Sequence, residues 1–211
     1  LATTFQVKAT KITVCNSCEV TSIKEAVFLA KKGDTILVKK GVYKETLINI
    51  NKSIHIIGEN YPIIDAENKK DTIFAIRANN FSISGFRFRN IAMSYTKEIA
   101  AVFITNSKNF IVENNIFENV FYAFILQRVK YGLIKNNKIT GNAIDESTAG
   151  NGVHVWKSKN LRIEQNTISG MRDGIYLEFT NDSFVSNNAS KNNVRYGLHF
   201  MFSNNNEYHH N

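Results

Sequence analysis

A repeat of about 22 residues runs through the second half of the chain and constrains its fold more than any other sequence feature. An Asn-Asn pair or a near variant closes each repeat. The second members of these pairs are Asn115, Asn137, Asn166, Asn188 and Asn211, which lie 22, 29, 22 and 23 residues apart. A period of this length indicates an architecture in which each unit buries its apolar face against its neighbours.

The residues before each Asn pair predict a short strand. A small residue lies fourteen positions before the second member of each pair, and the first and third residues after it are apolar. Alternation with a period of two is typical of a strand that is buried on one face. These apolar pairs are Val102/Ile104, Phe124/Leu126, Val153/Val155, Ile175/Leu177 and Leu198/Phe200. Short strands and turns at this period favour a parallel β-helix, whose equivalent residues stack about 4.8 Å apart.

The Asn pairs are predicted to be structural, and two polar inserts lengthen the repeat. Asn side chains at a repeated turn can hydrogen-bond from coil to coil, and Asn tolerates the left-handed backbone of tight turns. The inserts occupy residues 93–98 and 145–151. Since loops between coils can lengthen outward, we expect the insert 145–151 to project near the face that carries His154 and Trp156.

The beginning of the chain differs from the coils and predicts a helix. Ser22 and Glu25 have the spacing of a capping box, and Gly33 follows as a C-terminal stop. Apolar residues between them lie on one helical face. We therefore expect a helix over residues 22–32 that covers the first coil, because an open end would expose unpaired strand backbone.

Together these patterns predict an all-β chain that forms one structural domain. Residues 1–33 would supply an N-terminal strand and the capping α-helix, and residues 34–211 the coils of a right-handed parallel β-helix. The handedness follows the general bias of parallel crossovers. Apart from the five repeats, short strands are expected at residues 35–38, 46–50, 53–57, 72–76 and 81–84.

Composition excludes several classes of protein. The chain is 43% hydrophobic and 21% charged, which excludes wholesale disorder. No run approaches the ~18 apolar residues of a membrane span. The net charge is +8, from 26 Lys and Arg against 18 Asp and Glu, but the bases are scattered along the chain. A scattered excess favours a Lys-rich solvated surface, so no nucleic-acid partner is expected.

Cys15 and Cys18 form a C-x-x-C pair for which the sequence leaves several roles open. A redox motif of the thioredoxin type is disfavoured because no parallel α/β pattern follows. A zinc site would need two further ligands. A disulfide that closes a tight loop in an exported protein, or a thiol pair that holds a soft metal, both stay compatible with the spacing.

Three segments near the end of the chain carry a family resemblance: Gly152-Val-His-Val-Trp156, the run from Arg172 to Glu178, and Arg195-Tyr-Gly-Leu-His-Phe-Met201. They resemble the NosD family of exported, copper-related accessory proteins, and the chain looks like the N-terminal half of such a protein. The resemblance implies a role in maturation of nitrous oxide reductase and a periplasmic location, with the signal segment absent from this chain. It also implies three partners: a membrane ABC transporter, a copper chaperone and the reductase.

The outward positions of the repeated strands change character along the chain. Two columns run Phe103, Ile125, His154, Tyr176, His199 and Thr105, Gln127, Trp156, Glu178, Met201. His and Met are soft enough ligands for Cu(I), and residues two apart on one strand point to the same face. We therefore expect a copper site, with copper as Cu(I), from His199 and Met201. Further candidate ligands are Tyr176, Glu178, His154, His209 and His210.

The same face has two alternative interpretations. In the first, a partner docks on Trp156, Tyr176, Arg172 and Arg195. In the second, Met201 merely packs on the stems of Trp156 and Glu178.

A carbohydrate-binding protein or a polysaccharide lyase or hydrolase is the competing functional class, since many β-helices are such enzymes. Such an enzyme needs convergent carboxylates. Glu178 is the only acid in the two outward columns, and Asp173 is expected to form a local ion pair with Arg172. No catalytic residue is therefore expected, and a non-catalytic maturation factor is favoured.

Overall fold

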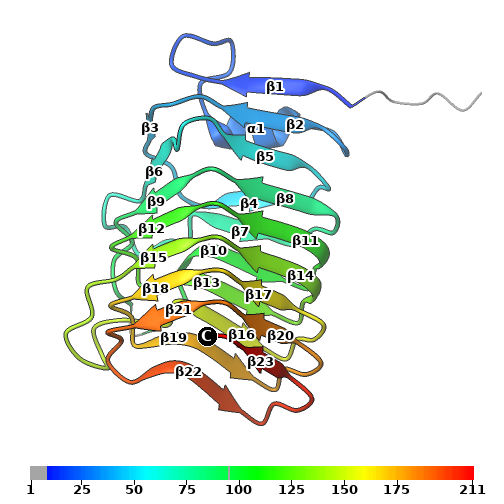
Figure 1. Ribbon diagram of the computed structural model, residues 1–211. Coiled ribbons are helices and arrows are strands. Elements are labelled where there is room, and N and C mark those ends of the chain that lie inside the picture. The colour runs from blue at the N-terminus through cyan, green and yellow to red at the C-terminus, as the bar shows by residue number, and fades with distance from the viewer. Residues whose placement is uncertain (1–8, 95) are drawn as a thin grey trace, which may run out of the picture.

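The computed structural model describes residues 9–94 and 96–211, so residues 1–8 of the expected N-terminal segment lie outside the described residues. The chain winds into three sheets of nine, seven and seven strands (Figure 1). Neighbouring strands in each sheet pair in parallel. The predicted parallel β-helix is confirmed.

The strands of the three sheets have the following bounds. The first sheet contains β1 (Lys11–Val14), β2 (Thr35–Val38), β5 (His55–Gly58), β8 (Phe81–Ser84), β11 (Lys108–Glu113), β14 (Lys130–Lys135), β17 (Arg162–Glu164), β20 (Phe184–Ser186) and β23 (Glu207–His209). The second sheet contains β4 (Ile48–Ile50), β7 (Phe74–Ile76), β10 (Ala100–Thr105), β13 (Tyr122–Gln127), β16 (Val153–Trp156), β19 (Asp173–Glu178) and β22 (Tyr196–Met201). The third sheet contains β3 (Val42–Tyr43), β6 (Ile63–Asp65), β9 (Arg87–Arg89), β12 (Ile116–Glu118), β15 (Lys138–Thr140), β18 (Thr167–Ser169) and β21 (Ala189–Lys191).

From β2 onward, successive strands along the chain visit the three sheets in turn, so each coil has one strand on each side. Inward-facing apolar residues of the strands up to β20 form one continuous core, and Leu198 of β22 packs against its end. Aromatic rings of successive coils stack within it: Phe81 on Phe110, and Phe88 on Phe117, with ring centroids 5.3 and 5.0 Å apart. Because each ring packs on its equivalent one coil away, the repeat that is visible in the sequence becomes the packing unit of the core.

The predicted Asn residues form a ladder along one corner of the solenoid, which is buried except at its last member, Asn211. In Asn137 the side-chain nitrogen Nδ2 donates to Oδ1 of Asn166 at 3.0 Å and to the carbonyl of Val112 at 3.1 Å. The same contacts recur from coil to coil in an unbroken row: Asn115, Asn137, Asn166, Asn188 and Asn211. The equivalence of these positions confirms the repeat frame. A buried amide with all its groups paired stabilises the turn that it occupies.

The first member of each pair adopts the left-handed backbone that tight turns require. Asn114, Asn136, Gln165, Asn187 and His210 have φ angles between 52° and 57°, in the left-handed region. The turn therefore needs two consecutive residues of different function. One accepts a left-handed backbone, and the next supplies the amide that hydrogen-bonds to the neighbouring coil.

The helix α1 (Ile23–Leu29) is shorter than expected and is capped differently. Ser22 accepts a hydrogen bond from the backbone N–H of Glu25, as the capping box predicts. The two N–H groups of Ile23 and Lys24 are satisfied by the carboxylate of Glu45, which is remote in sequence. The helix packs on β1, β2 and β4 at the N-terminal end of the stack (Figure 1). Lys52 donates to three carbonyls at its C-terminal end, among them that of Ala30.

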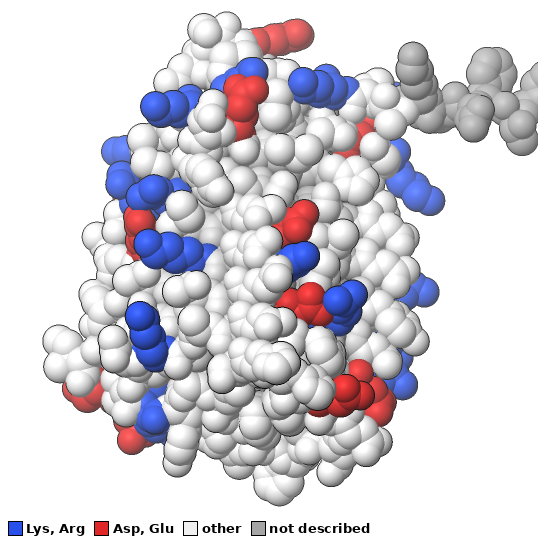
Figure 2. All heavy atoms as spheres, viewed as in Figure 1, with Lys and Arg blue, Asp and Glu red and all other residues white. Residues whose placement is uncertain are grey.

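Three further features bear on the environment of the protein. Cys15 and Cys18 form a disulfide, so the thiol-pair alternative does not apply. In residues 9–94 and 96–211, no helix is long and apolar enough to cross a membrane. Figure 2 shows one face of the molecule, on which Lys and Arg side chains are spread over many coils with acidic side chains among them.

Candidate functional site

The two outward columns that the sequence predicted lie side by side on the second sheet. His154, Tyr176 and His199 are in register on β16, β19 and β22, and Trp156, Glu178 and Met201 follow in the same register. We call the outward surface of these three strands the site face. Because parallel pairing places equivalent residues about 4.8 Å apart, the site face brings these side chains into one compact group.

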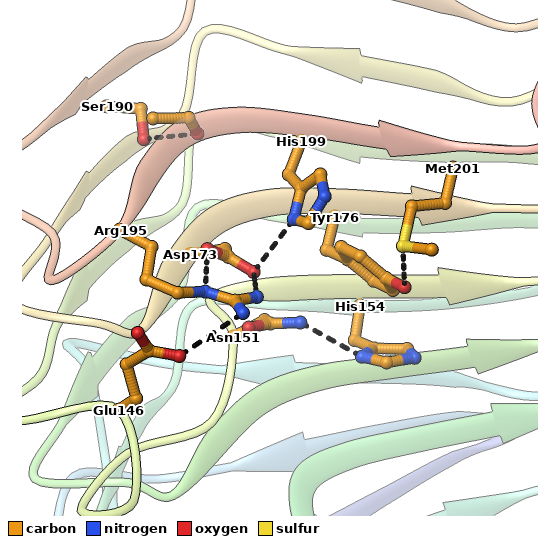
Figure 3. A network of polar contacts seen from close by, with 10 residues as sticks. Glu146, Asn151, His154, Asp173, Tyr176, Ser190, Arg195, His199 and Met201 are labelled. Carbon is orange, nitrogen blue, oxygen red and sulfur yellow. Dashed lines mark hydrogen bonds and ion pairs between the residues drawn. The ribbon is translucent and has the colours of Figure 1, made fainter.

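A stack of aromatic and imidazole rings runs along the site face. His154 lies 5.6 Å from Tyr122 and 4.9 Å from Tyr176, and Tyr176 lies 4.8 Å from His199, between ring centroids. The ring of Tyr196 contacts His199 at 4.6 Å from a position earlier on the same strand. This packing buries Tyr176 almost completely, and burial raises the pKa of its hydroxyl. The rings therefore hold the two imidazoles in fixed positions (Figure 3).

Asp173 is the buried anchor of the site face. Its side chain is 0% exposed, and Arg195 donates to both of its carboxylate oxygens, from Nε to Oδ1 at 3.0 Å and from Nη2 to Oδ2. Burial raises the pKa of Asp173, but hydrogen bonds from Arg195 and His199 outweigh it and hold the pKa below its ordinary value. The expected ion pair of Asp173 with Arg172 is wrong. The partner comes from the next coil, because stacked coils bring Arg195 alongside the carboxylate.

The same carboxylate orients His199. Nδ1 of His199 lies 3.3 Å from Oδ2 of Asp173. Since an ionised carboxylate only accepts hydrogen bonds, Nδ1 carries the proton. In the neutral ring Nε2 then bears a lone pair. A carboxylate behind a histidine is the arrangement that prepares imidazole for metal binding.

Met201 lies on the same strand as His199 and is partly engaged. Its sulfur accepts a hydrogen bond from the hydroxyl of Tyr176 at 3.1 Å, and the side chain remains 36% exposed. The contact of its sulfur is thus with Tyr176, whereas Trp156 and Glu178 were the neighbours considered from the sequence. A thioether is a weak acceptor, so this hydrogen bond is exchangeable for a stronger ligand.

His154 is held in a drier environment. Its Nδ1 lies 3.1 Å from the side-chain nitrogen of Asn151, which donates, so the neutral ring carries its proton on Nε2. Burial lowers the pKa of His154 to about 4, and the nearby charge of Arg172 contributes in the same direction. His154 is therefore neutral near pH 7 and, in this tautomer, presents no free lone pair.

The other expected site residues are distributed over the surface around this centre. Trp156 lies between two cations, with the guanidinium of Arg128 5.0 Å and the ammonium of Lys157 4.4 Å from its ring. Trp156 is half-buried, and both cations contact its ring at the surface. Glu178 stands opposite Met201 on the neighbouring strand. Arg172 lines a pocket beside the site face.

His209 and His210 do not join the site face. His209 ends β23 in the first sheet, where its Nε2 lies 3.2 Å from Glu207 and its ring packs against Phe184. His210 occupies the left-handed turn position that follows. Among the described residues, no group of three or more His, Cys, Asp or Glu side chains is arranged to hold a metal ion.

The insert and two unexpected residues complete the surroundings. Ile144 is 87% exposed beside the loop that contains Glu146, which projects from the side of the solenoid (Figure 1). Glu146 reaches Arg195 at 3.3 Å. Sequence reasoning missed the roles of Asp173 and Asn151. The repeat places Asp173 in register with Tyr196 one coil later, and Tyr196 directly follows Arg195. This register was the signal from which the pair of Asp173 with Arg195 could have been predicted.

Comparison with solved structures shows β-helix enzymes of similar fold. The catalytic domain of an α-1,3-glucanase in complex with nigerose has a TM-score of 0.69 at 17% identity, covering 95% of this chain and 39% of that chain. An alginate lyase from Paenibacillus sp. str. FPU-7 has a TM-score of 0.58 at 12% identity, covering 85% of this chain and 75% of that chain. This chain thus spans about two fifths of the length of the glucanase domain. At these identities the likeness is one of fold alone.

The chain also matches the model of a described protein family. No curated protein matches. The model of the periplasmic copper-binding protein NosD matches residues 29–211, which include every coil and the whole site face. The match agrees with the three C-terminal segments that carry the resemblance in the sequence. The chain belongs to the NosD family of periplasmic copper-binding proteins.

Proposed function

We propose that this chain is a non-catalytic periplasmic protein that receives and passes on Cu(I) during maturation of nitrous oxide reductase, together with a copper chaperone and a membrane ABC transporter. One observation carries the proposal: the buried carboxylate of Asp173 lies behind His199 and leaves Nε2 of that ring free, two residues from Met201. Membership of the NosD family supports copper as the cargo.

The chemistry of the two side chains suits Cu(I). Imidazole nitrogen and thioether sulfur are soft ligands, and residues two apart on one strand have Cα atoms about 6.5–7 Å apart on one face. To bind through its sulfur, Met201 releases the hydroxyl of Tyr176, which then remains beside the ion. Glu178, opposite Met201, is placed to add a third ligand. An open site of two or three ligands favours transfer of copper over storage.

His154 has a supporting role in this proposal. The amide nitrogen of Asn151 faces its Nδ1, so the proton resides on Nε2 and that atom donates. Binding of copper by Nε2 would require the amide of Asn151 to turn and present its oxygen to a protonated Nδ1. The side-chain oxygen of Asn151 is buried and has no partner among the described residues, so such a turn sacrifices no existing hydrogen bond of that oxygen.

We further propose that partners dock on the surface around Trp156, with Tyr176 and the two arginines Arg172 and Arg195 nearby. Trp156 is partly exposed and lies between cations. Arg195 is committed to Asp173 and Glu146, so it acts by holding this surface in place. The disulfide between Cys15 and Cys18 suits an oxidising compartment and supports the periplasmic location.

Two finer features of the fold belong to the proposal. We propose right-handed winding, which parallel crossovers strongly prefer. We also propose that α1 serves as the cap of a single domain whose N-terminal segment is 1–33 and whose coils are 34–211. The helix buries Ile23 and Ala26 completely, which supports a covering role at the first coil.

The proposal is tested by competition for Cu(I) against a colorimetric chelator under reducing conditions. We expect His199→Ala and Met201→Ala each to weaken binding at least tenfold. His209→Ala is the matched control, because His209 is a more exposed histidine on another sheet and its loss leaves the affinity unchanged. Equal affinity of the wild type and the His199→Ala/Met201→Ala double variant would exclude these two residues from copper handling.

A carbohydrate-active protein is the second candidate function, favoured by the fold shared with an α-1,3-glucanase and an alginate lyase. On the site face, both oxygens of Asp173 are engaged and its pKa is held low, which disfavours a role as general acid. Release of reducing or unsaturated sugar from α-1,3-glucan or alginate, abolished by Glu178→Gln, would establish this candidate in place of copper handling.

A further inference from the structure

A pocket of about 330 Å³ lies beside the site face, where the two polar inserts approach each other. The first insert contributes Lys97 and Glu98, the second Glu146 and Ser147, and the coils contribute Tyr122 and Arg172. Its volume falls within the range of small-molecule sites. The pocket is distinct from the proposed copper ligands, none of which line it.

The described acids and bases that line this pocket are equal in number but are not paired with one another. Glu146 lies 3.3 Å from Arg195, whose charge it shares with Asp173. Glu98 accepts a hydrogen bond from the amide of Gln127 at 2.7 Å and retains its negative charge. Among the residues that the structure describes, Lys97 and Arg172 form no ion pair. Neither cation is therefore engaged by the acids that share the pocket with it.

The side chain of Arg172 provides the main evidence that a ligand binds in this pocket. Its Nε is buried and has no hydrogen-bond partner within the described part of the chain. A buried donor without a partner is destabilising, so a group that accepts a hydrogen bond from it is stabilising. The backbone N–H of Arg172 donates to the carbonyl of Gly150 at 2.9 Å, which ties the residue to the base of the second insert. The guanidinium fork is suited to a carboxylate, which it can bind through two parallel hydrogen bonds.

The wall of the pocket is aromatic. Tyr122 and Phe121 both line it, and their rings contact each other edge to face at 4.9 Å. The carbon atoms of the Tyr122 ring lie so close to Gly150 that a Cβ there would approach them to 2.6 Å, so the ring is fixed from behind. A fixed aromatic wall offers a surface on which a ring-shaped ligand can pack.

We propose that this pocket binds a small monocarboxylate whose charged group pairs with Arg172 and whose ring packs against Tyr122 and Phe121. A single carboxylate matches the one guanidinium fork of Arg172, and the carboxylates of Glu98 and Glu146 disfavour a dianion such as phosphate. A sugar acid and an aromatic acid both have this chemistry. At the rim, Ser147 can hydrogen-bond to the hydroxyl groups of a sugar acid, and Lys97 can attract the carboxylate of either kind of acid.

The test is isothermal titration of the full chain with four probes: galacturonate, its neutral analogue galactose, benzoate and inorganic phosphate. We expect a carboxylate to bind at least tenfold more tightly than galactose and than phosphate. Tighter binding of galacturonate than of benzoate assigns the site to sugar acids, and the reverse order assigns it to aromatic acids. Binding of phosphate or galactose at least as tight as that of both acids would overturn the proposal, as would no binding of either acid at 20 mM.

Variants separate the pocket from the rest of the surface. Arg172→Gln should weaken carboxylate binding at least tenfold, and Arg172→Lys, which keeps the charge and loses the fork, should weaken it severalfold. Arg162→Gln is the matched control, since Arg162 is an exposed arginine on the first sheet and its loss should leave binding unchanged. If Arg172→Gln lowers the melting temperature, the Nε–H resonance of Arg172 in the wild type gives a second readout. That resonance should shift on titration with the acid, and an unmoved resonance would contradict the site.

Discussion

Arg195 holds the fully buried carboxylate of Asp173, one coil earlier, through hydrogen bonds to both of its oxygens. The pair links β19 to the residue that precedes β22. The same carboxylate keeps the proton of His199 on Nδ1. A structural ion pair and a candidate ligand therefore share one carboxylate, so a change in Arg195 acts on both stability and metal chemistry.

Arg195→Ala should lower the free energy of unfolding by about 3–5 kcal/mol, because it leaves a buried carboxylate without its cation. Urea denaturation at pH 7 measures the effect. Arg162→Ala is the control: Arg162 pairs with Glu164, but its side chain is far more exposed, and its loss should cost less than about 1 kcal/mol. Equal losses for the two variants would contradict the anchoring role of Arg195.

Asn137→Ala should destabilise the chain by about 2–4 kcal/mol, because it removes an amide in the middle of the ladder and leaves buried groups of two coils unpaired. The denaturation midpoint measures it. Asn49→Ala removes an exposed amide that donates only to the carbonyl of Leu47, two residues earlier, and should change stability by less than about 0.5 kcal/mol. A loss below 1 kcal/mol for Asn137→Ala would show that the ladder contributes little.

The stability of the chain should fall as the pH is lowered from about 6.5 to about 4 because of His154. Its pKa is about 4 in the folded chain and its ordinary value is 6.5, so the unfolded chain binds the proton more readily in this window. The contribution is complete above pH 6.5 and is lost toward pH 4, by about 2–3 kcal/mol.

Urea denaturation at half-unit steps of pH, for the wild type and His154→Gln, measures the effect of this histidine. The difference between the two curves should change across the window and remain constant from pH 7 to 8. Parallel curves from pH 4 to 7 would mean that His154 is protonated as easily in the folded chain as in the unfolded chain.

Trp156→Ala should weaken association with a partner at least fivefold and leave the melting temperature within about 3 °C of the wild type. The side chain points outward in the second sheet and its ring contacts two cations, so its loss opens no cavity in the core. Pull-down from a periplasmic extract of a denitrifying cell measures association, with Tyr131→Ala, an exposed aromatic on the first sheet, as the control. A large fall in melting temperature would show that Trp156 is a structural residue.

The sequence by itself determined the repeat, one strand of each later coil and the identity of the outward columns, whereas the short strands of the third sheet were not predicted. These features depend on local periodicity, and a solenoid converts a period in sequence directly into a stack in space. The Asn positions, the expected strand at residues 81–84 and the columns through Tyr176 and Glu178 were therefore predicted correctly. The two bonded cysteines also agree with one of the alternatives that their spacing left open.

Only the tertiary structure decided which charged groups pair between coils. Asp173 has Arg172 as its neighbour in sequence, yet its partner is Arg195, because the parallel stack brings the following coil closer to the carboxylate than the adjacent side chain. Glu45 caps the helix α1 from a remote position for the same reason. The pairing of charged side chains depends on rotamers and on distances between neighbouring segments, which the repeat period does not specify.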